Sequence, residues 1–133
     1  MKKTFFTALF AVMAILITSC SSDPFVGKWV PDNDTSGKSI TQFNSDGTAE
    51  LIGDADDGTY HMDGTWSHVE GSENTITLKY DSSTAKVDLD NPLAEQIVMI
   101  ALQEAGKTTQ TLTLSDDGKR LTADGGNGYF VRY

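Results

Sequence analysis

Residues 39–53 read SITQFNSDGTAELIG, two short runs of strand-forming residues joined by the turn sequence NSDG at 44–47. In such a turn the side chain of Asp46 caps the backbone, and Gly47 supplies the positive φ that sends the chain back as a hairpin. The same device recurs at residues 115–118, which read SDDG. Both turns predict antiparallel strands that are neighbours in sequence and in space.

Short strand-forming runs separated by turns continue to the end of the chain. Apolar and polar residues alternate within them, as in ITLKY at 76–80 and YHMDGTW at 60–66, so each strand has one dry and one wet face. The candidate strands are residues 25–30, 39–44, 48–53, 59–69, 75–80, 85–89, 109–114, 120–123 and 128–133. This pattern predicts an all-β fold, an antiparallel up-and-down meander that closes into a barrel of about eight strands.

Residues 92–105 (PLAEQIVMIALQEA) form the exception, because their periodicity is helical. Asn91 is a suitable N-cap, Pro92 fits the first helical position and Gly106 follows as a stop. The apolar residues cover about 200° of the helical wheel, so the helix is expected to be covered over most of its circumference. It would insert before the last three strands, either as a plug that completes the core or as a lid over a ligand cavity.

The first twenty residues are typical of an export signal. Lys2 and Lys3 precede an apolar run from residue 5 to 17, too short for a permanent membrane helix and suited to a secretory signal peptide. The following ITSC, at 17–20, resembles the lipobox of bacterial lipoproteins. That resemblance implies cleavage before Cys20, a diacylglycerol on its thiol and, with Ser21 next, sorting to the outer membrane. The expected organisation is a signal peptide at 1–19, a short tether at 20–24 and a barrel domain at 25–133.

Charge and length exclude some classes of partner and of domain organisation. Residues 20–133 carry 8 basic and 19 acidic side chains, a net charge of −11, and no basic stripe that would neutralise phosphates. The acidic balance argues against nucleic acid as a partner. About 114 residues allow one small domain, and a lone cysteine excludes an internal disulfide.

Several motifs resemble the lipocalin and calycin superfamily and, within it, the small lipocalin-like domains of bacterial lipoproteins. FVGKW at 25–29 resembles the G-x-W opening strand, and Arg132 in the last strand is the kind of residue that packs across that tryptophan in those folds. ITQFNSDGT at 40–48 and GTW at 64–66 resemble further recurring motifs of those domains. The resemblance implies a barrel held together by a cation–π pair of Trp29 and Arg132. The sequence departs from the family pattern in two ways: it lacks a T-D-Y signature, and no helix follows its last strand.

Catalytic and metal-binding signals are weak. His61 and His68 are seven residues apart, which places them on opposite faces of an unbroken strand and disfavours a shared metal. The acidic run DADDG at 54–58 lacks the glutamate and flanking helices of a calcium loop, and an acidic turn is the better interpretation. No nucleophile elbow or paired catalytic carboxylates occur. The sequence therefore predicts neither an enzyme nor a bound metal or cofactor.

The leading functional hypothesis is a membrane-anchored binding module for a small, partly apolar ligand. The inward positions expected to line its cavity, or equally to fill its core, are Trp29, Phe43, Tyr60, Met62, Trp66, Leu78 and Tyr80. A ligand requires an interior void of about 300 Å³ or more. The alternative is a solid barrel that acts as an accessory protein and binds another protein of the cell envelope, facing either the periplasm or the cell surface.

Overall fold

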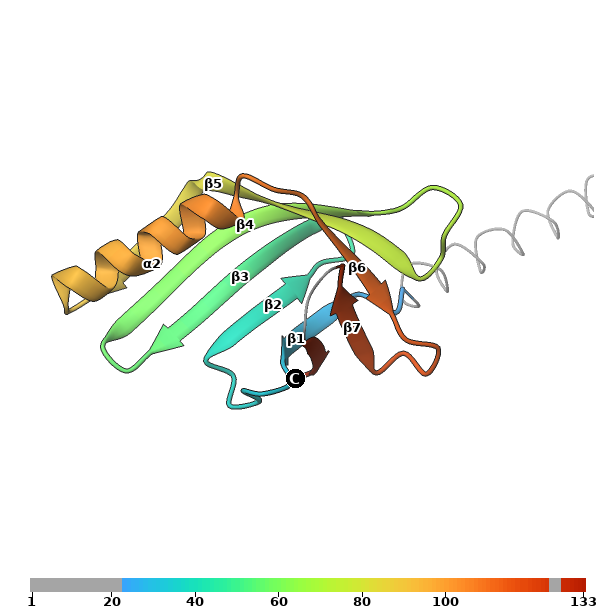
Figure 1. Cartoon of the computed structure of the whole chain (residues 1–133), viewed down its shortest axis with the longest axis horizontal. Coiled ribbons are helices and arrows are strands. Elements are labelled where there is room, and N and C mark those ends of the chain that lie inside the picture. The colour runs from blue at the N-terminus through green and yellow to red at the C-terminus, as the bar shows by residue number, and fades with distance from the viewer. Residues whose placement is uncertain (1–22, 125–127) are drawn as a thin grey trace, which may run out of the picture.

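The computed structural model describes residues 23–124 and 128–133. Within them the chain forms a closed barrel in which each strand pairs antiparallel with the next and the last pairs with the first (Figure 1). The elements are β1 (Gly27–Pro31), β2 (Ser39–Phe43), β3 (Thr48–Ala55), β4 (Gly58–His68), β5 (Thr75–Leu89), α2 (Pro92–Ala105), β6 (Gln110–Leu114), β7 (Arg120–Ala123) and β8 (Tyr129–Arg132). The predicted eight-stranded meander, with one helix before the last three strands, is confirmed.

Both SDG-type turns have the predicted chemistry. Gly47 and Gly118 have φ of +88° and +73°, in the region that favours glycine. The side chain of Asp46 accepts a hydrogen bond from the backbone N–H of Thr48 at 3.0 Å, and Asp117 accepts one from Lys119 at 3.0 Å. The pKa of each carboxyl lies below the usual 3.8. The largest cause is a hydrogen bond from a hydroxyl, that of Thr48 to Asp46 and that of Ser115 to Asp117, and the second largest is the backbone hydrogen bond just described.

The predicted strands 75–80 and 85–89 are one strand, β5, which corrects the sequence-based division. On β4, His61 pairs with Lys86, but Asp63 pairs with Asp81, so four residues of β5 lie opposite one residue of β4. This bulge switches the inward positions from even numbers to odd ones, and the simple alternation breaks there. The aspartate at 81 accepts a hydrogen bond from the backbone N–H of Ser83 within the bulge.

The helix has the predicted bounds and start. The side chain of Asn91 accepts hydrogen bonds from the backbone N–H groups of Leu93 and Ala94. At the other end Gly106 has φ of −74°, so its role is close packing, since a Cβ there would lie 2.7 Å from the Cβ of Ser82.

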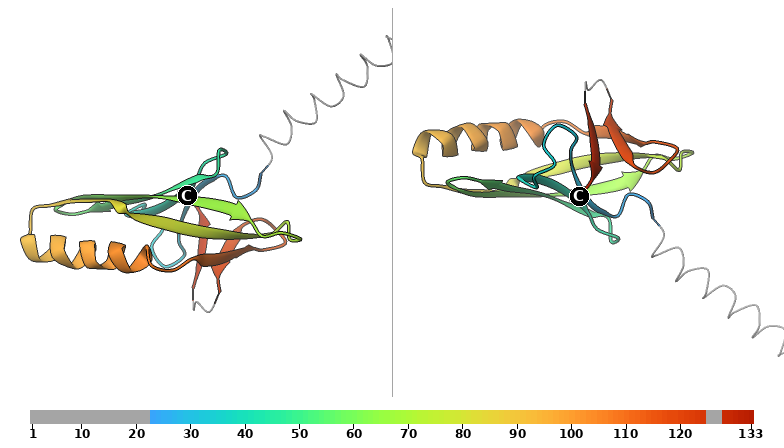
Figure 2. Two further views of the ribbon diagram at one scale, coloured as in Figure 1. Left: turned by 90° about the horizontal axis from the view of Figure 1, so that it is seen from above. Right: turned by 90° about the horizontal axis from the view of Figure 1, so that it is seen from below.

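Helix α2 lies along the long strands β4 and β5, on the same side of the sheet that they form as β6 and β7 (Figure 2). It packs mainly on β5, with Leu102 buried in the core. The expectation of cover on most of its circumference is wrong, because the N-terminal half extends past the short strands. Leu93, Ile97 and Ile100 remain 65%, 59% and 63% exposed.

The segment before β1 contacts the barrel. Asp23 and Pro24, assigned to the tether, are held on the barrel: Asp23 Oδ2 lies 2.9 Å from His68 Nε2, and Arg132 donates a hydrogen bond to the carbonyl of Pro24. The predicted signal peptide at 1–19 and Cys20 lie outside the described residues. No helix in the described part of the chain is long and apolar enough to cross a membrane.

Candidate ligand cavity

Trp29 and Arg132 pack against each other where the last strand meets the first. They are direct partners in the β1–β8 pairing, and the guanidinium carbon of Arg132 lies 4.2 Å from the centroid of the Trp29 ring. Such a cation–π contact contributes about 0.5–2 kcal/mol. Gly27 permits the close approach, because it has φ of +130° and a Cβ there would lie 3.1 Å from Nη1 of Arg132. The structure thus brings the predicted pair together.

An aromatic cluster fills the barrel beside this pair. The Trp66 ring makes a tilted contact with Phe25, at a centroid distance of 6.1 Å, and an edge-to-face contact with Phe43 at 5.6 Å. Both indole N–H groups are paired, because Trp29 donates to the carbonyl of Phe25 and Trp66 to that of Asn44, each at 2.9 Å. Burial here therefore leaves no indole donor unsatisfied.

The rest of the interior is not filled by side chains. A partly open cavity of about 300 Å³ is bounded by inward-facing side chains of the barrel, and of the helix only Ala105 lines it. The lining consists of Trp29, Pro31, Ser39, Thr41, Phe43, Leu51, Leu78, Tyr80, Ala105, Gln110, Leu112, Leu121 and Phe130. Helix α2 contributes Leu102 to the core, as expected of a plug, and only its C-terminal end borders the cavity, whose walls are mostly strands.

The cavity is apolar, with a few hydrogen-bonding groups and no Asp, Glu, Lys or Arg in its lining. Thr41 is buried, and Ser39 and Gln110 are half-buried. Burial raises the pKa of the Tyr80 hydroxyl, while a hydrogen bond with the Thr41 side chain has a smaller opposing effect. The hydroxyl therefore stays neutral, and a charged ligand would find no partner for its charge here.

Three larger hollows, of about 460, 600 and 420 Å³, lie elsewhere on the surface. The first runs beside the β5 bulge and is lined by Asp63, Lys79 and Asp81 among others. The second borders Asp23 and the turn at Asp117. The third is lined by Asp32, Tyr129 and Phe130 among others. All three are more open than the smaller cavity and have charged groups in their lining, so the smaller cavity is the better site for an apolar molecule.

Four of the seven predicted interior residues line the cavity: Trp29, Phe43, Leu78 and Tyr80. The other three do not. Met62 and Trp66 belong to the packed core, and the ring of Tyr60 covers Gly53, where an added Cβ would lie 1.9 Å from it. Alternation along a strand identified the inward face correctly for all three, but it carries no information on depth along the barrel axis.

Sequence reasoning missed the polar part of the lining. Ser39 and Thr41 share the inward face of β2 with Phe43, and Gln110 shares that of β6 with Leu112. The period-two pattern already assigned these positions to the interior. The sequence prediction of the lining included large apolar residues alone, and these positions are polar.

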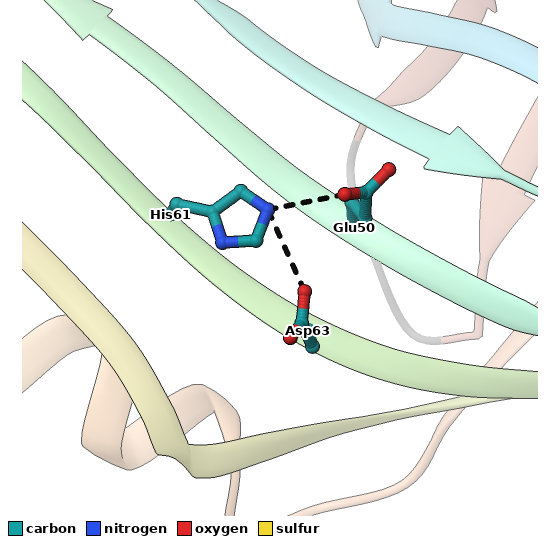
Figure 3. Close-up of side chains that lie close together, drawn as sticks. All are labelled: Glu50, His61 and Asp63. Atoms are coloured by element: carbon teal, nitrogen blue, oxygen red, sulfur yellow. Dashed lines mark hydrogen bonds and ion pairs between the residues drawn. The ribbon is translucent and has the colours of Figure 1, made fainter.

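A second group of side chains was also missed. Glu50, His61 and Asp63 gather on the outer face of the β3–β4 hairpin, with one ligand-type atom of each within 4.8 Å of the others (Figure 3). His68 lies elsewhere, beside Asp23 and the Phe25 ring. The sequence-based arguments against a metal concerned the spacing of the two histidines and the acidic run at 54–58, neither of which includes Glu50 or Asp63. The hairpin register, in which Glu50 is opposite Asp63, identifies this group once the turn at 56–57 is located.

Comparison with known proteins adds no relative: no protein-family model, no curated protein and no solved structure matches the chain.

The separation between packed core and cavity gives a test on Met62, which is fully buried outside the cavity lining. Met62→Ala is expected to lower the free energy of unfolding by about 2–5 kcal/mol, because it leaves a void among packed side chains. Denaturant unfolding measures this. A loss below about 1 kcal/mol would contradict a packed environment for Met62.

Proposed function

We propose that this chain is a non-catalytic binding module whose barrel holds one small, largely apolar and uncharged molecule. The observation that carries the proposal is the interior cavity of about 300 Å³, walled by aromatic and aliphatic side chains with a few hydrogen-bonding groups. Ligand sites in proteins have this composition.

The cavity also indicates the size and polarity of the ligand. Its volume lies at the lower end of the range for ligand pockets, about 300–1,000 Å³, which suits one or two fused rings better than a long acyl chain. The hydroxyls of Thr41 and Tyr80 and the amide of Gln110 would orient a single polar group. A ligand with a net charge is disfavoured, because it would lose its hydration without gaining a counter-charge.

Anchoring is the second part of the proposal. The positive start, the short apolar run and the ITSC sequence ending at Cys20 support a lipoprotein signal, with lipid on the Cys20 thiol and attachment to the outer membrane. Multiple acyl chains provide stable attachment, since each buried methylene contributes about 0.8 kcal/mol. The lipocalin-like resemblance, supported by the Trp29–Arg132 pair, belongs to the same proposal.

One observation favours the second function, an accessory protein that binds another envelope protein. The exposed side chains Leu93, Ile97 and Ile100 lie at helical spacing on α2 and form an apolar stripe. Such a stripe is a common feature of protein-binding surfaces. It ranks second because it does not account for the cavity.

The cavity proposal predicts a difference between two adjacent residues of β2. Ser39 lines the cavity, whereas Ile40 faces outward and pairs with Ile52 on β3. Ser39→Phe should place a ring in the cavity and weaken binding of the neutral fluorescent probe N-phenylnaphthylamine by about tenfold or more. Ile40→Phe, the matched control, should leave the affinity unchanged.

Fluorescence titration measures both affinities, and thermal unfolding verifies that both variants fold. Equal affinity in the two variants, or no probe binding by the unmodified protein, would contradict ligand binding in the barrel and favour the accessory function.

Anchoring predicts the behaviour of Cys20→Ala. This variant should leave the membrane fraction, because the thiol that carries the lipid is gone, while the barrel remains folded. Cell fractionation followed by detection of the protein measures the shift, with Ser21→Ala as the control that keeps the thiol. A Cys20→Ala variant that stays in the membrane fraction would overturn the lipid anchor.

A further inference from the structure

The outer face of the β3–β4 hairpin carries a group of side chains that the ligand cavity does not use. His61 Nε2 lies 3.3 Å from Glu50 Oε1 and 3.5 Å from Asp63 Oδ1, and the three side chains converge on one point in Figure 3. All three belong to a regular two-stranded pairing, with Glu50 directly opposite Asp63 and His61 opposite Ile52. Paired strands hold such groups in a more fixed arrangement than a loop does.

The distances are compatible with a shared metal ion as well as with the hydrogen bond that His61 makes to Glu50. Charge-assisted N–H···O bonds to carboxylates are about 2.7–2.9 Å long, shorter than both contacts of His61 Nε2. Zinc binds imidazole nitrogen at about 2.0–2.1 Å and carboxylate oxygen at about 2.0–2.2 Å, so two ligands of a tetrahedral ion lie about 3.3–3.6 Å apart. Both contacts of His61 fall in that interval.

Electrostatics point in the same direction. Glu50 lies opposite Asp63, and Asp63 lies opposite Asp81, so three carboxylates follow one another across neighbouring strands. Like charges directly opposite each other destabilise a sheet. In the described part of the chain, the Lys and Arg ion pairs are Lys38 with Asp56 and Lys107 with Glu104, and neither includes these carboxylates. Lys79 has an electrostatic effect on Asp81, which leaves Glu50 and Asp63 as the pair to be neutralised. A cation bound between Glu50 and Asp63 would offset the repulsion.

We propose that Glu50, His61 and Asp63 bind one divalent transition-metal ion of the zinc type. His61 would supply Nε2 and each carboxylate one oxygen, a nitrogen and oxygen donor set that suits zinc rather than calcium or magnesium. The carboxylates are partly exposed, with Glu50 at 33% and Asp63 at 54%, so the fourth position is open to water. The site lies on the outer face and is independent of the barrel cavity.

The test is calorimetric titration of Zn²⁺ into the purified, chelator-treated protein near neutral pH. We expect one zinc ion per chain, and binding about tenfold weaker or more in each of His61→Asn, Glu50→Gln and Asp63→Asn. His68→Asn is the matched control, because among the described residues His68 forms an ion pair with a single carboxylate, that of Asp23. Its zinc affinity should equal that of the unmodified protein.

A second readout separates metal binding from a purely structural ion pair. Zn²⁺ should raise the unfolding temperature of the unmodified protein and of His68→Asn, because it binds only the folded arrangement, and should leave that of His61→Asn unchanged. Absence of stoichiometric binding to the unmodified protein would overturn the site and leave a His61 ion pair only. Binding that survives His61→Asn and is lost in His68→Asn would also overturn it, since zinc would then occupy the Asp23–His68 pair.

Discussion

The pairing of β1 with β8 is the contact on which the rest of the structure depends, because it turns a meander into a barrel with an interior. Much of this strand pairing is stabilised by the single side chain of Arg132. It stacks on Trp29 and donates hydrogen bonds to the carbonyls of Val26 and Pro24, so the last strand holds both the first strand and the segment that leads into it. The same contact buries Trp29 completely, and Trp29 then forms one wall of the cavity.

Successive side chains of a strand point to opposite faces, so the two faces of the β3–β4 hairpin carry different groups of residues. On β4 the inward residues Tyr60, Met62 and Trp66 pack the core, while His61 and Asp63 between them face outward with Glu50. The bulge in β5 then reverses the parity of inward positions, so that Ala85 and Val87 also pack against the core beyond the bulge. Helix α2 covers this extension and reaches the cavity only through Ala105.

Much of this arrangement follows from the sequence, because its causes are local. The Asp46 and Asp117 turns, the Asn91 cap and the alternation of β4 each depend on residues a few positions apart. The cavity and the outer cluster depend instead on how far each strand is shifted along its neighbours. Alternation places Met62 and Leu78 on the same inner face and both are buried in the core, but only the register puts Leu78, and not Met62, on the cavity wall. The division of β5 into two predicted strands has a similar cause. Its bulge inserts three extra residues relative to β4, and in the sequence these residues resemble a turn between two strands.

Native mass spectrometry of the protein, released gently from the cells that make it and compared before and after organic extraction, tests the ligand-binding role most directly. We expect one additional mass per chain, of the size of a small uncharged molecule, which disappears on extraction. A mass equal to that of the chain alone before extraction, together with no uptake of N-phenylnaphthylamine, would contradict a ligand-binding barrel.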